Sequence, residues 1–137
     1  METWIILSVT SLIIPLIMLI FSIIFLKKAP DKINPVYGYR SRRSMKSKEA
    51  WKFAHYLCAK IWLIASIILL TLTAVAMLLV INKSENVIGT VGQIVTYSQL
   101  AVIVLSIIPV EVSLKRNFDE NGNRKNSDDA TSSEQNT

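Results

Sequence analysis

The segment LIIPLIMLIFSIIFL, residues 12–26, is almost entirely apolar. It closes a longer run, residues 4–26, that contains no Lys, Arg, Asp or Glu. A helix of about 20 apolar residues crosses the roughly 30 Å of hydrocarbon in a bilayer, and this run is long enough. A buried helix of a soluble protein would show a polar residue every three or four positions on its outer face, and no such face recurs here. We therefore predict a transmembrane helix.

Two further runs, residues 61–81 and 87–110, are also uncharged and of similar length. Closed helices satisfy their own backbone hydrogen bonds in lipid, which suits long runs without alternating polarity. A cleaved signal peptide is the alternative for the first run. That run lacks a positive leading segment and a following A-x-A site, so we expect it to remain in the protein. The chain is predicted to be an all-α integral membrane protein, with a three-helix transmembrane domain over residues 1–114.

The connector between the first two runs, residues 27–60, concentrates the positive charge of the chain. It holds ten of the 15 Lys and Arg residues, against the acidic residues Asp31 and Glu49. The ten are Lys27, Lys28, Lys32, Arg40, Arg42, Arg43, Lys46, Lys48, Lys52 and Lys60. Because cytoplasmic loops carry the excess of Lys and Arg, we expect this connector and the C-terminus inside and the N-terminus outside. Anionic lipid headgroups are expected partners, at roughly 1 kcal/mol per cation near the surface.

The second half of the connector is predicted to be an amphipathic basic helix. Ser47 is a suitable N-cap, since its oxygen can accept a hydrogen bond from the amide of Glu49 or Ala50. We expect this helix to lie at the membrane interface or to pack on the bundle before it continues into residues 61–81. The tail over residues 115–137 is polar, with Phe118 as its one aromatic residue, and we predict that it is disordered and cytoplasmic.

The first half of the connector predicts a tight turn at NPVYGYRS, residues 34–41. Pro35 favours an extended backbone at the residue before it, and Gly38 permits a positive φ. Such a turn is expected to present Tyr37, Tyr39 and Arg40 at the level of the lipid headgroups. A guanidinium there can form two parallel hydrogen bonds to a phosphate or a carboxylate.

Two residues inside the predicted helices interrupt the apolar pattern. Pro15 removes the hydrogen bond to the carbonyl of Ser11, so we expect a kink whose freed groups are satisfied by Thr10 and Ser11. Gln99 lies near the middle of the third run, where an unpaired amide is costly, so it should face another helix. A polar path for a ligand, and pairing of two copies of the chain, are the open alternatives for this intramembrane polar residue.

The sequence offers little for catalysis or metal binding. Cys58 is the single cysteine and His55 the single histidine, so neither a disulfide nor a zinc ligand set is expected. Ser41 and Ser44 lack a recognisable base partner, so we expect a protein that is not an enzyme and has no cofactor. We also expect no direct nucleic-acid binding, because membrane orientation already accounts for the basic connector. His55, near Trp51, is expected to form hydrogen bonds at the interface.

The connector contains an ordered motif that reads N-x3-G-x-R-S-x2-S-x6-W. Its residues are Asn34, Gly38, Arg40, Ser41, Ser44 and Trp51. Followed by AWKFAHYLCAK and an apolar helix, it resembles the SdpI family of bacterial membrane proteins, named for immunity to a sporulation-delaying toxin. The usual family motif resembles G-x-R-T-x2-[ST], so Ser41 replaces the common Thr and keeps its hydroxyl. The chain is similar to a short form with one motif and three helices.

The resemblance implies a multi-pass protein of the bacterial plasma membrane that protects its cell from a secreted antimicrobial peptide toxin. In some members it also implies capture of a cytosolic transcriptional regulator. The residues expected to bind the ligand or partner are the six motif residues together with His55. Our first hypothesis is a membrane immunity protein that binds the toxin among the helices or at the Arg40 turn. The alternatives are a signalling module that sequesters the regulator, and a small transporter.

Overall fold

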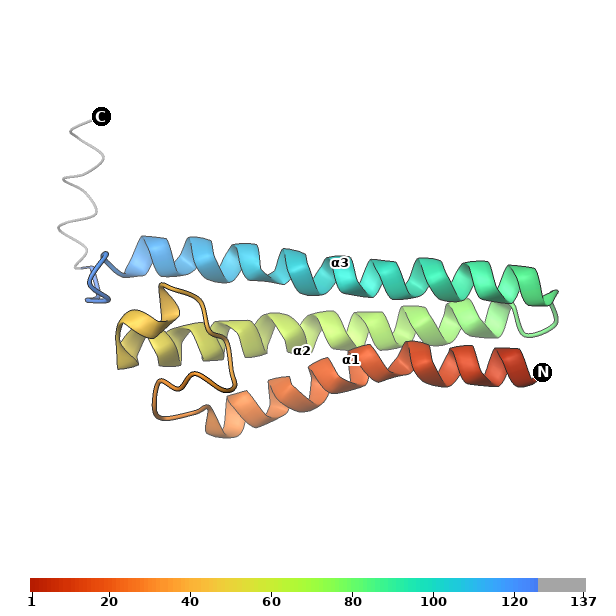
Figure 1. The fold of residues 1–137 in the computed structure, drawn as a ribbon, viewed down its shortest axis with the longest axis horizontal. Coiled ribbons are helices and arrows are strands. Elements are labelled where there is room, and N and C mark those ends of the chain that lie inside the picture. Colours follow the sequence, from red (N-terminus) through yellow and green to blue (C-terminus); the bar gives the residue numbers. More distant parts are fainter. Residues whose placement is uncertain (126–137) are drawn as a thin grey trace, which may run out of the picture.

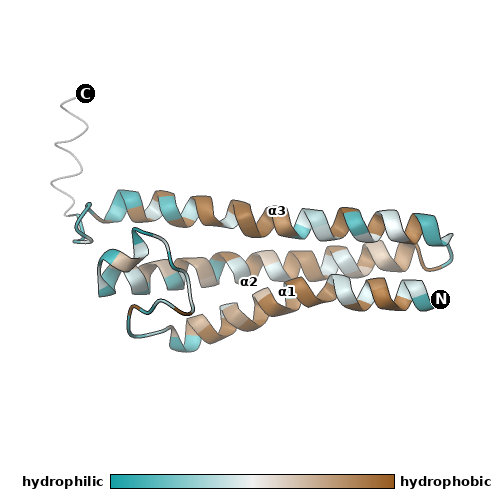
Figure 2. Ribbon diagram, in the orientation of Figure 1, coloured by the Kyte–Doolittle hydropathy of each residue, from teal (hydrophilic) through white to brown (hydrophobic). Residues whose placement is uncertain are grey.

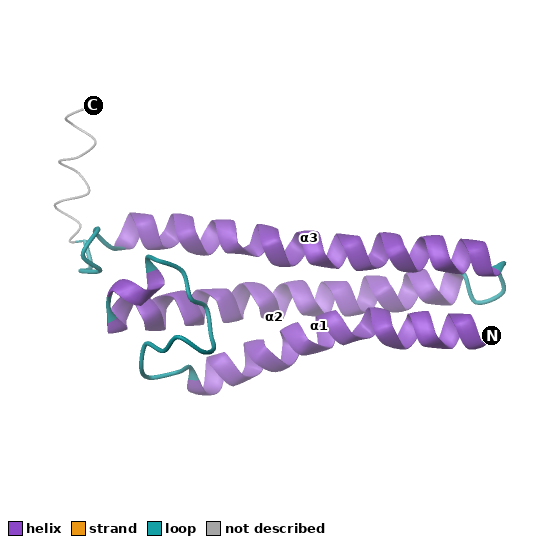
Figure 3. Ribbon diagram, viewed as in Figure 1, coloured by secondary structure: helices purple, strands orange, loops and turns teal. Residues whose placement is uncertain are grey.

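The structure, a computed structural model, describes residues 1–125 and consists of three long helices packed into a bundle (Figure 1). In chain order the elements are α1 (Glu2–Lys28), the 3-10 helix η1 (Ser44–Lys46), α2 (Lys48–Leu79) and α3 (Glu85–Asn117). Helices make up most of the described chain, and an irregular loop joins α1 to η1 (Figure 3). The N-terminus and the turn between α2 and α3 lie at one end of the bundle. The irregular loop and the end of α3 lie at the other, which we call the connector end.

All three helices are long and apolar enough to cross a membrane. Hydrophobic residues dominate their middle sections, and the loop at the connector end is mostly hydrophilic (Figure 2). Large apolar side chains such as Ile17, Ile68 and Val104 point outward from the bundle. An apolar surface of this extent is unfavourable in water and suits contact with acyl chains. The predicted all-α membrane protein with three transmembrane helices is therefore confirmed.

The predicted connector helix and the second transmembrane run form one continuous helix, α2. Its N-cap is Ser47, as predicted, and the Ser47 Oγ accepts a hydrogen bond from the Ala50 amide at 3.1 Å. The first turns of α2 bury Ala50, Ala54 and Cys58 in an apolar cluster with Val110 and Leu114 of α3. Of the two expected placements, the structure therefore has the helix packed on the bundle.

Gln99 joins all three helices in the middle of the bundle. Its Nε2 donates to the carbonyl of Ser11 in α1 and to Thr73 Oγ1 in α2, each at 2.9 Å. Pro15 has no amide hydrogen to give to the Ser11 carbonyl, so α3 supplies the donor that α1 lacks. The predicted self-repair by Thr10 is wrong, because the Thr10 hydroxyl donates to the carbonyls of Ile6 and Leu7. Gln99 faces other helices, as predicted.

Past its proline, α1 slants away from α3, so the bundle is wider at the connector end (Figure 1). The helix itself stays unbroken from Glu2 to Lys28. A proline inside a helix bends it because the ring displaces the preceding turn and one hydrogen bond is missing. The divergence of α1 leaves space between the helices for the site described below.

The C-terminal residues differ from the predicted disordered tail. Residues 115–117 belong to α3, and residues 118–125 form a turn that is closed by an isolated bridge between Phe118 and Arg124. Phe118 is buried, with its ring centroid 5.4 Å from that of Phe53. This burial supplies an apolar contact that the polar composition of the tail does not indicate. The rest of the predicted tail, residues 126–137, lies outside the described residues.

Candidate functional site

The irregular loop of residues 29–43 is held in shape by side chains that bond to backbone atoms. Asn34 begins its tight turn, since the Asn34 Oδ1 accepts hydrogen bonds from the amides of Val36 at 3.0 Å and Tyr37 at 2.9 Å. An Asx turn of this kind replaces backbone bonds that an irregular segment cannot make for itself. Asn34 is therefore placed to fold the turn, and its amide oxygen is already occupied.

Gly38 lies where the loop crosses α2 and touches His55. Its φ is 102°, and a Cβ at this position would lie 2.4 Å from the Nε2 of His55. The positive φ and the lack of space both require glycine. Directly after it, the Tyr39 amide donates to the same Nε2 at 2.9 Å.

His55 is fully buried, and its two ring nitrogens have distinct partners. Nε2 accepts from the Tyr39 amide, so the proton of the neutral ring resides on Nδ1, which donates to the Trp51 carbonyl at 2.7 Å. The ring also packs against Trp51, at 4.3 Å between centroids, and against Phe25 of α1. His55 therefore connects the loop to two helices, and both nitrogens are in use.

Ser41 and Ser44 pair reciprocally around the start of η1. The Ser41 amide donates to the Ser44 Oγ at 2.9 Å, and the Ser44 amide donates to the Ser41 Oγ at 3.1 Å. Each hydroxyl thereby caps a backbone amide that the short 3-10 helix leaves free. The Ser44 hydroxyl also donates to the Tyr39 carbonyl at 3.0 Å. This reciprocal pairing needs a hydroxyl at both positions, which either Ser or Thr supplies, and this need accounts for the two hydroxyl positions of the motif.

Trp51 anchors the loop from below. It is fully buried in α2, and its indole nitrogen donates to the carbonyl of Pro30 at 2.7 Å, just after the end of α1. Of the predicted site residues, Arg40 alone has an exposed side chain; its Nη1 donates to the Pro35 carbonyl within the turn. The predicted binding set is thus brought together, but most of it builds the loop and Arg40 remains available at the surface.

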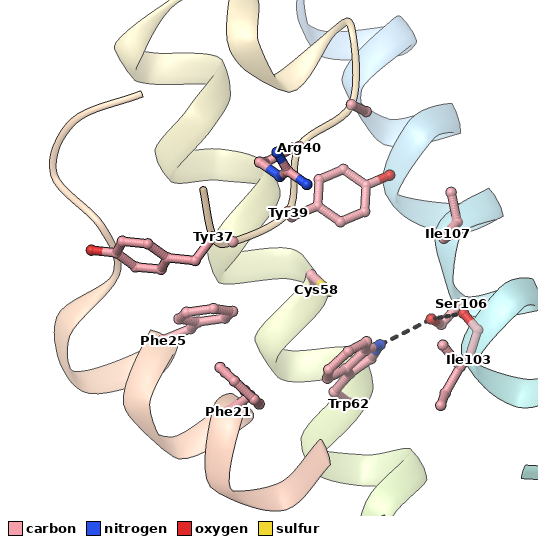
Figure 4. A pocket seen from close by; sticks show the side chains of 12 residues that line it. Phe21, Phe25, Tyr37, Tyr39, Arg40, Cys58, Trp62, Ile103, Ser106 and Ile107 are labelled. Carbon is pink, nitrogen blue, oxygen red and sulfur yellow. Dashed lines mark hydrogen bonds between the residues drawn. The ribbon is translucent and has the colours of Figure 1, made fainter. Parts of the chain in front are cut away.

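A pocket of about 420 Å³ lies beneath the loop, between the diverging ends of the helices. α2 forms its back wall, α1 and α3 its two sides, and the loop its roof (Figure 4). The lining residues are Phe21 and Phe25 of α1, Cys58 and Trp62 of α2, Ile103, Ser106 and Ile107 of α3, and Tyr37, Gly38, Tyr39, Arg40 and Ser41 of the loop. Its volume falls within the range of small-molecule and side-chain binding sites, and its walls are mainly aromatic and aliphatic.

Few polar groups face this pocket, and the structure gives two of them partners. The Trp62 Nε1 donates to the Ser106 Oγ at 2.9 Å across the floor, which ties α2 to α3. Arg40 lies at the upper edge, beside Tyr37 and Tyr39 (Figure 4). The site therefore combines an apolar aromatic cavity with one cation at its rim, an arrangement that suits an amphipathic ligand. Residues 1–125 bring no three His, Cys, Asp or Glu side chains together for a metal ion.

Tyr39 and Glu111 form a contact that the sequence analysis missed. The Tyr39 hydroxyl donates to Glu111 Oε1 at 2.6 Å, which fixes the loop to α3. Burial, and then the hydrogen bond and negative charge of Glu111, raise the pKa of the Tyr39 phenol well above its ordinary value. The expected display of both tyrosines at the headgroups is therefore wrong for Tyr39, which turns inward, whereas Tyr37 is exposed. The one signal in the sequence was Glu111 itself, a carboxylate at the edge of an apolar run that needs a partner.

The comparisons with known proteins agree with this architecture. Residues 31–110 match the model of the SdpI/YfhL protein family, a segment that contains residues 31–43 of the loop, the motif, α2 and most of α3. No curated protein and no solved structure matches the chain. Because the matched segment covers more than half of the chain and includes every motif residue, this multi-pass membrane protein belongs to the SdpI/YfhL family.

Proposed function

We propose that the protein is an immunity protein of the bacterial plasma membrane, which protects its cell by binding a secreted membrane-active peptide in the pocket beneath the motif loop. The observation that carries this proposal is the placement of the pocket. It lies between transmembrane helices, and the family motif forms its roof. The Lys and Arg content of the connector favours a cytoplasmic connector end, so the pocket opens near the inner face of the membrane.

The lining of the pocket fits a peptide that is already inserted in lipid. Phe21 of α1 and Ile107 of α3 line the pocket and have exposed side chains, so a ligand within the bilayer can reach it between these two helices. Phe21, Phe25 and Trp62 offer aromatic surfaces to an apolar side chain, and Arg40 at the rim can pair with a peptide carboxylate. A peptide held there cannot join others to disrupt the membrane.

The test is heterologous expression followed by challenge with the cognate peptide. Ile107→Trp places a larger side chain in the pocket from α3 and leaves the residues of the loop unchanged, so protection should be lost. The matched control is Leu105→Trp, at an exposed position of the same helix that does not line the pocket, which should protect as well as the unsubstituted chain. Equal protection by both variants, at equal membrane abundance, would exclude binding in this pocket.

A second candidate function, capture of a cytosolic regulator, is supported by the cations at the connector end. Arg42, Lys46 and Lys48 are exposed on or beside η1, outside the pocket. They form a positive surface to which an acidic protein can bind. A photo-crosslinker at position 42 should then trap a soluble protein in cells. If it traps only lipid, while the challenge assay above shows protection, the regulator hypothesis fails and the immunity hypothesis stands.

A further inference from the structure

The outward face of α3 carries exposed residues spaced alternately four and three apart. These six residues, which we call the α3 seam, are Asn86, Thr90, Gln93, Tyr97, Leu100 and Val104. Such spacing keeps side chains on one stripe of a helix, and it is the repeat by which paired helices interlock. The seam points away from the face of α3 that carries Gly92 and Gln99, which contact α1 and α2.

Two side chains of the seam are unsuited to contact with lipid. Gln93 is eight residues and Tyr97 twelve residues beyond Glu85, the first residue of α3, which places them about 12 Å and 18 Å along the helix. Tyr97 is 70% exposed, and neither side chain hydrogen-bonds to any residue of the described chain. An amide or hydroxyl in hydrocarbon is costly without a partner, and acyl chains offer none at this depth.

Other outward polar side chains avoid this cost within their own helix. The hydroxyls of Thr90 and Ser98 donate to carbonyls four residues earlier, at 2.8 Å and 2.7 Å. Outward hydroxyls of the other two helices, such as Thr71, do the same. A glutamine amide or a tyrosine hydroxyl is not satisfied in this way here, so Gln93 and Tyr97 mark this face of α3 for a protein partner.

We propose that the partner is a second copy of this chain, paired in parallel along the α3 seam. Two copies in one membrane share the same orientation, so a two-fold axis along the membrane normal brings each seam residue opposite its counterpart at the same depth. An amide both donates and accepts, and so does a phenol, which means that Gln93 and Tyr97 can each pair with themselves. At Gly89, beside the seam, no atom of another helix lies within 4 Å of the position that a Cβ would occupy, so the two backbones can approach closely there.

The pairing is independent of the proposed peptide binding. The polar part of the seam, residues 86–97, lies toward the end of the bundle away from the loop. The pocket is lined on α3 by Ile103, Ser106 and Ile107, nearer the connector end. Failure of one proposal therefore leaves the other untouched.

Cysteine crosslinking of the full chain in membranes tests the pairing. The background is Cys58→Ala, which removes the single native thiol, a buried one. Leu100→Cys places a thiol in the seam and Leu105→Cys places one at an exposed position outside it. Oxidation should link two copies through position 100 and leave position 105 unlinked, because a disulfide needs Cβ atoms about 4 Å apart. Equal linking at both positions, or none at position 100, would overturn the proposal.

Dilution in lipid vesicles tests the role of the amide. Gln93→Leu should weaken association about five- to twenty-fold, measured by energy transfer between labelled copies as the lipid-to-protein ratio rises. Gln93→Asn, which keeps a donor and an acceptor, should restore part of the loss. Since position 93 faces outward, the leucine is not expected to disturb the fold. Unchanged association in Gln93→Leu, or a purified chain that stays monomeric while position 100 links to a different protein in cells, would refute the pairing with a second copy.

Discussion

The connector end and the middle of the bundle are held together by different means. At the connector end, the side chains of Asn34, Ser41, Ser44 and Trp51 all bond to backbone atoms of the irregular loop or of η1 directly after it. In the middle, Gln99 makes polar contacts with both other helices, and Trp62 adds one between α2 and α3. Helices satisfy their own backbone, so a few polar side chains suffice between them, whereas an irregular loop needs a partner for nearly every amide and carbonyl.

This contrast explains why the recognisable motif consists of the loop and the residues of η1 and α2 that hold it, and not of the lipid-facing helix positions. Each position of the motif makes a structural contact that few residue types can make, whereas the lipid-facing positions need only be apolar. Arg40 is the exception within the motif, because its side chain stays exposed at the rim of the pocket. Most motif residues therefore build the roof of the site, and Arg40 is the motif residue whose side chain can contact a ligand.

Trp51→Ala should give the largest effect, because it damages the connector end at its anchor. The substitution leaves a void beneath the loop and removes the donor to the Pro30 carbonyl. We expect the free energy of unfolding in mixed micelles, measured by titration with a denaturing detergent, to fall by about 3–5 kcal/mol. Tyr56→Ala removes an exposed aromatic side chain from the same helix and should cost much less. Equal losses would mean that the loop is not anchored as described.

Gly38→Ala should have an intermediate effect, confined to the loop. Alanine at a φ of 102° is strained, and its Cβ meets the His55 ring at 2.4 Å. The expected cost is about 1–3 kcal/mol, with faster proteolysis at the neighbouring Arg and Lys residues as the readout. Gly89→Ala, in a helix with open space around it, should leave the proteolysis rate unchanged. A protected loop in Gly38→Ala would contradict the contact with His55.

Gln99→Leu should have the smallest effect, and a double-mutant cycle with Pro15 isolates the part that comes from the contact with Ser11. Interhelical hydrogen bonds in membranes are worth about 0.6 kcal/mol on average, so the loss of two should cost about 1–2 kcal/mol. Pro15→Ala restores the amide that serves the Ser11 carbonyl within α1. In that background, Gln99→Leu should therefore cost about half as much, measured in the same unfolding titration. The same cost in both backgrounds would show that the contact with Ser11 contributes nothing.

Most of the fold followed from local features of the sequence. The three apolar runs, the Ser47 cap and the inward direction of Gln99 all rest on rules that need only neighbouring residues. The contacts between distant residues did not follow. The freed Ser11 carbonyl and the lone Gln99 were both identified, but they are 88 residues apart, and their pairing depends on the rotation and depth of two helices. Tyr39 and Glu111, 72 residues apart, were missed for the same reason.

The candidate site was predicted in location and not in its inner arrangement. The motif marked the connector, but a list of residues cannot distinguish side chains that point into a cavity from those that hold its roof. The pocket also needs the divergence of α1 past Pro15, which a helical pattern does not report. Phe118 shows the same limit in the tail, because one aromatic side chain in a polar segment is enough to dock it when Phe53 lies opposite.

The Ser47 hydroxyl forms two hydrogen bonds, one as acceptor and one as donor. It accepts from the Ala50 amide and donates to the Gly122 carbonyl at 2.6 Å, and Gly122, with a φ of 82°, passes against Lys46 where no larger residue fits. The start of α2 and the chain beyond α3 thus share one atom, so fraying of either releases the other. A disturbance of residues 118–125 is therefore expected to reach the base of the motif loop, because the segment that follows α3 and the start of α2 are bonded through the same hydroxyl.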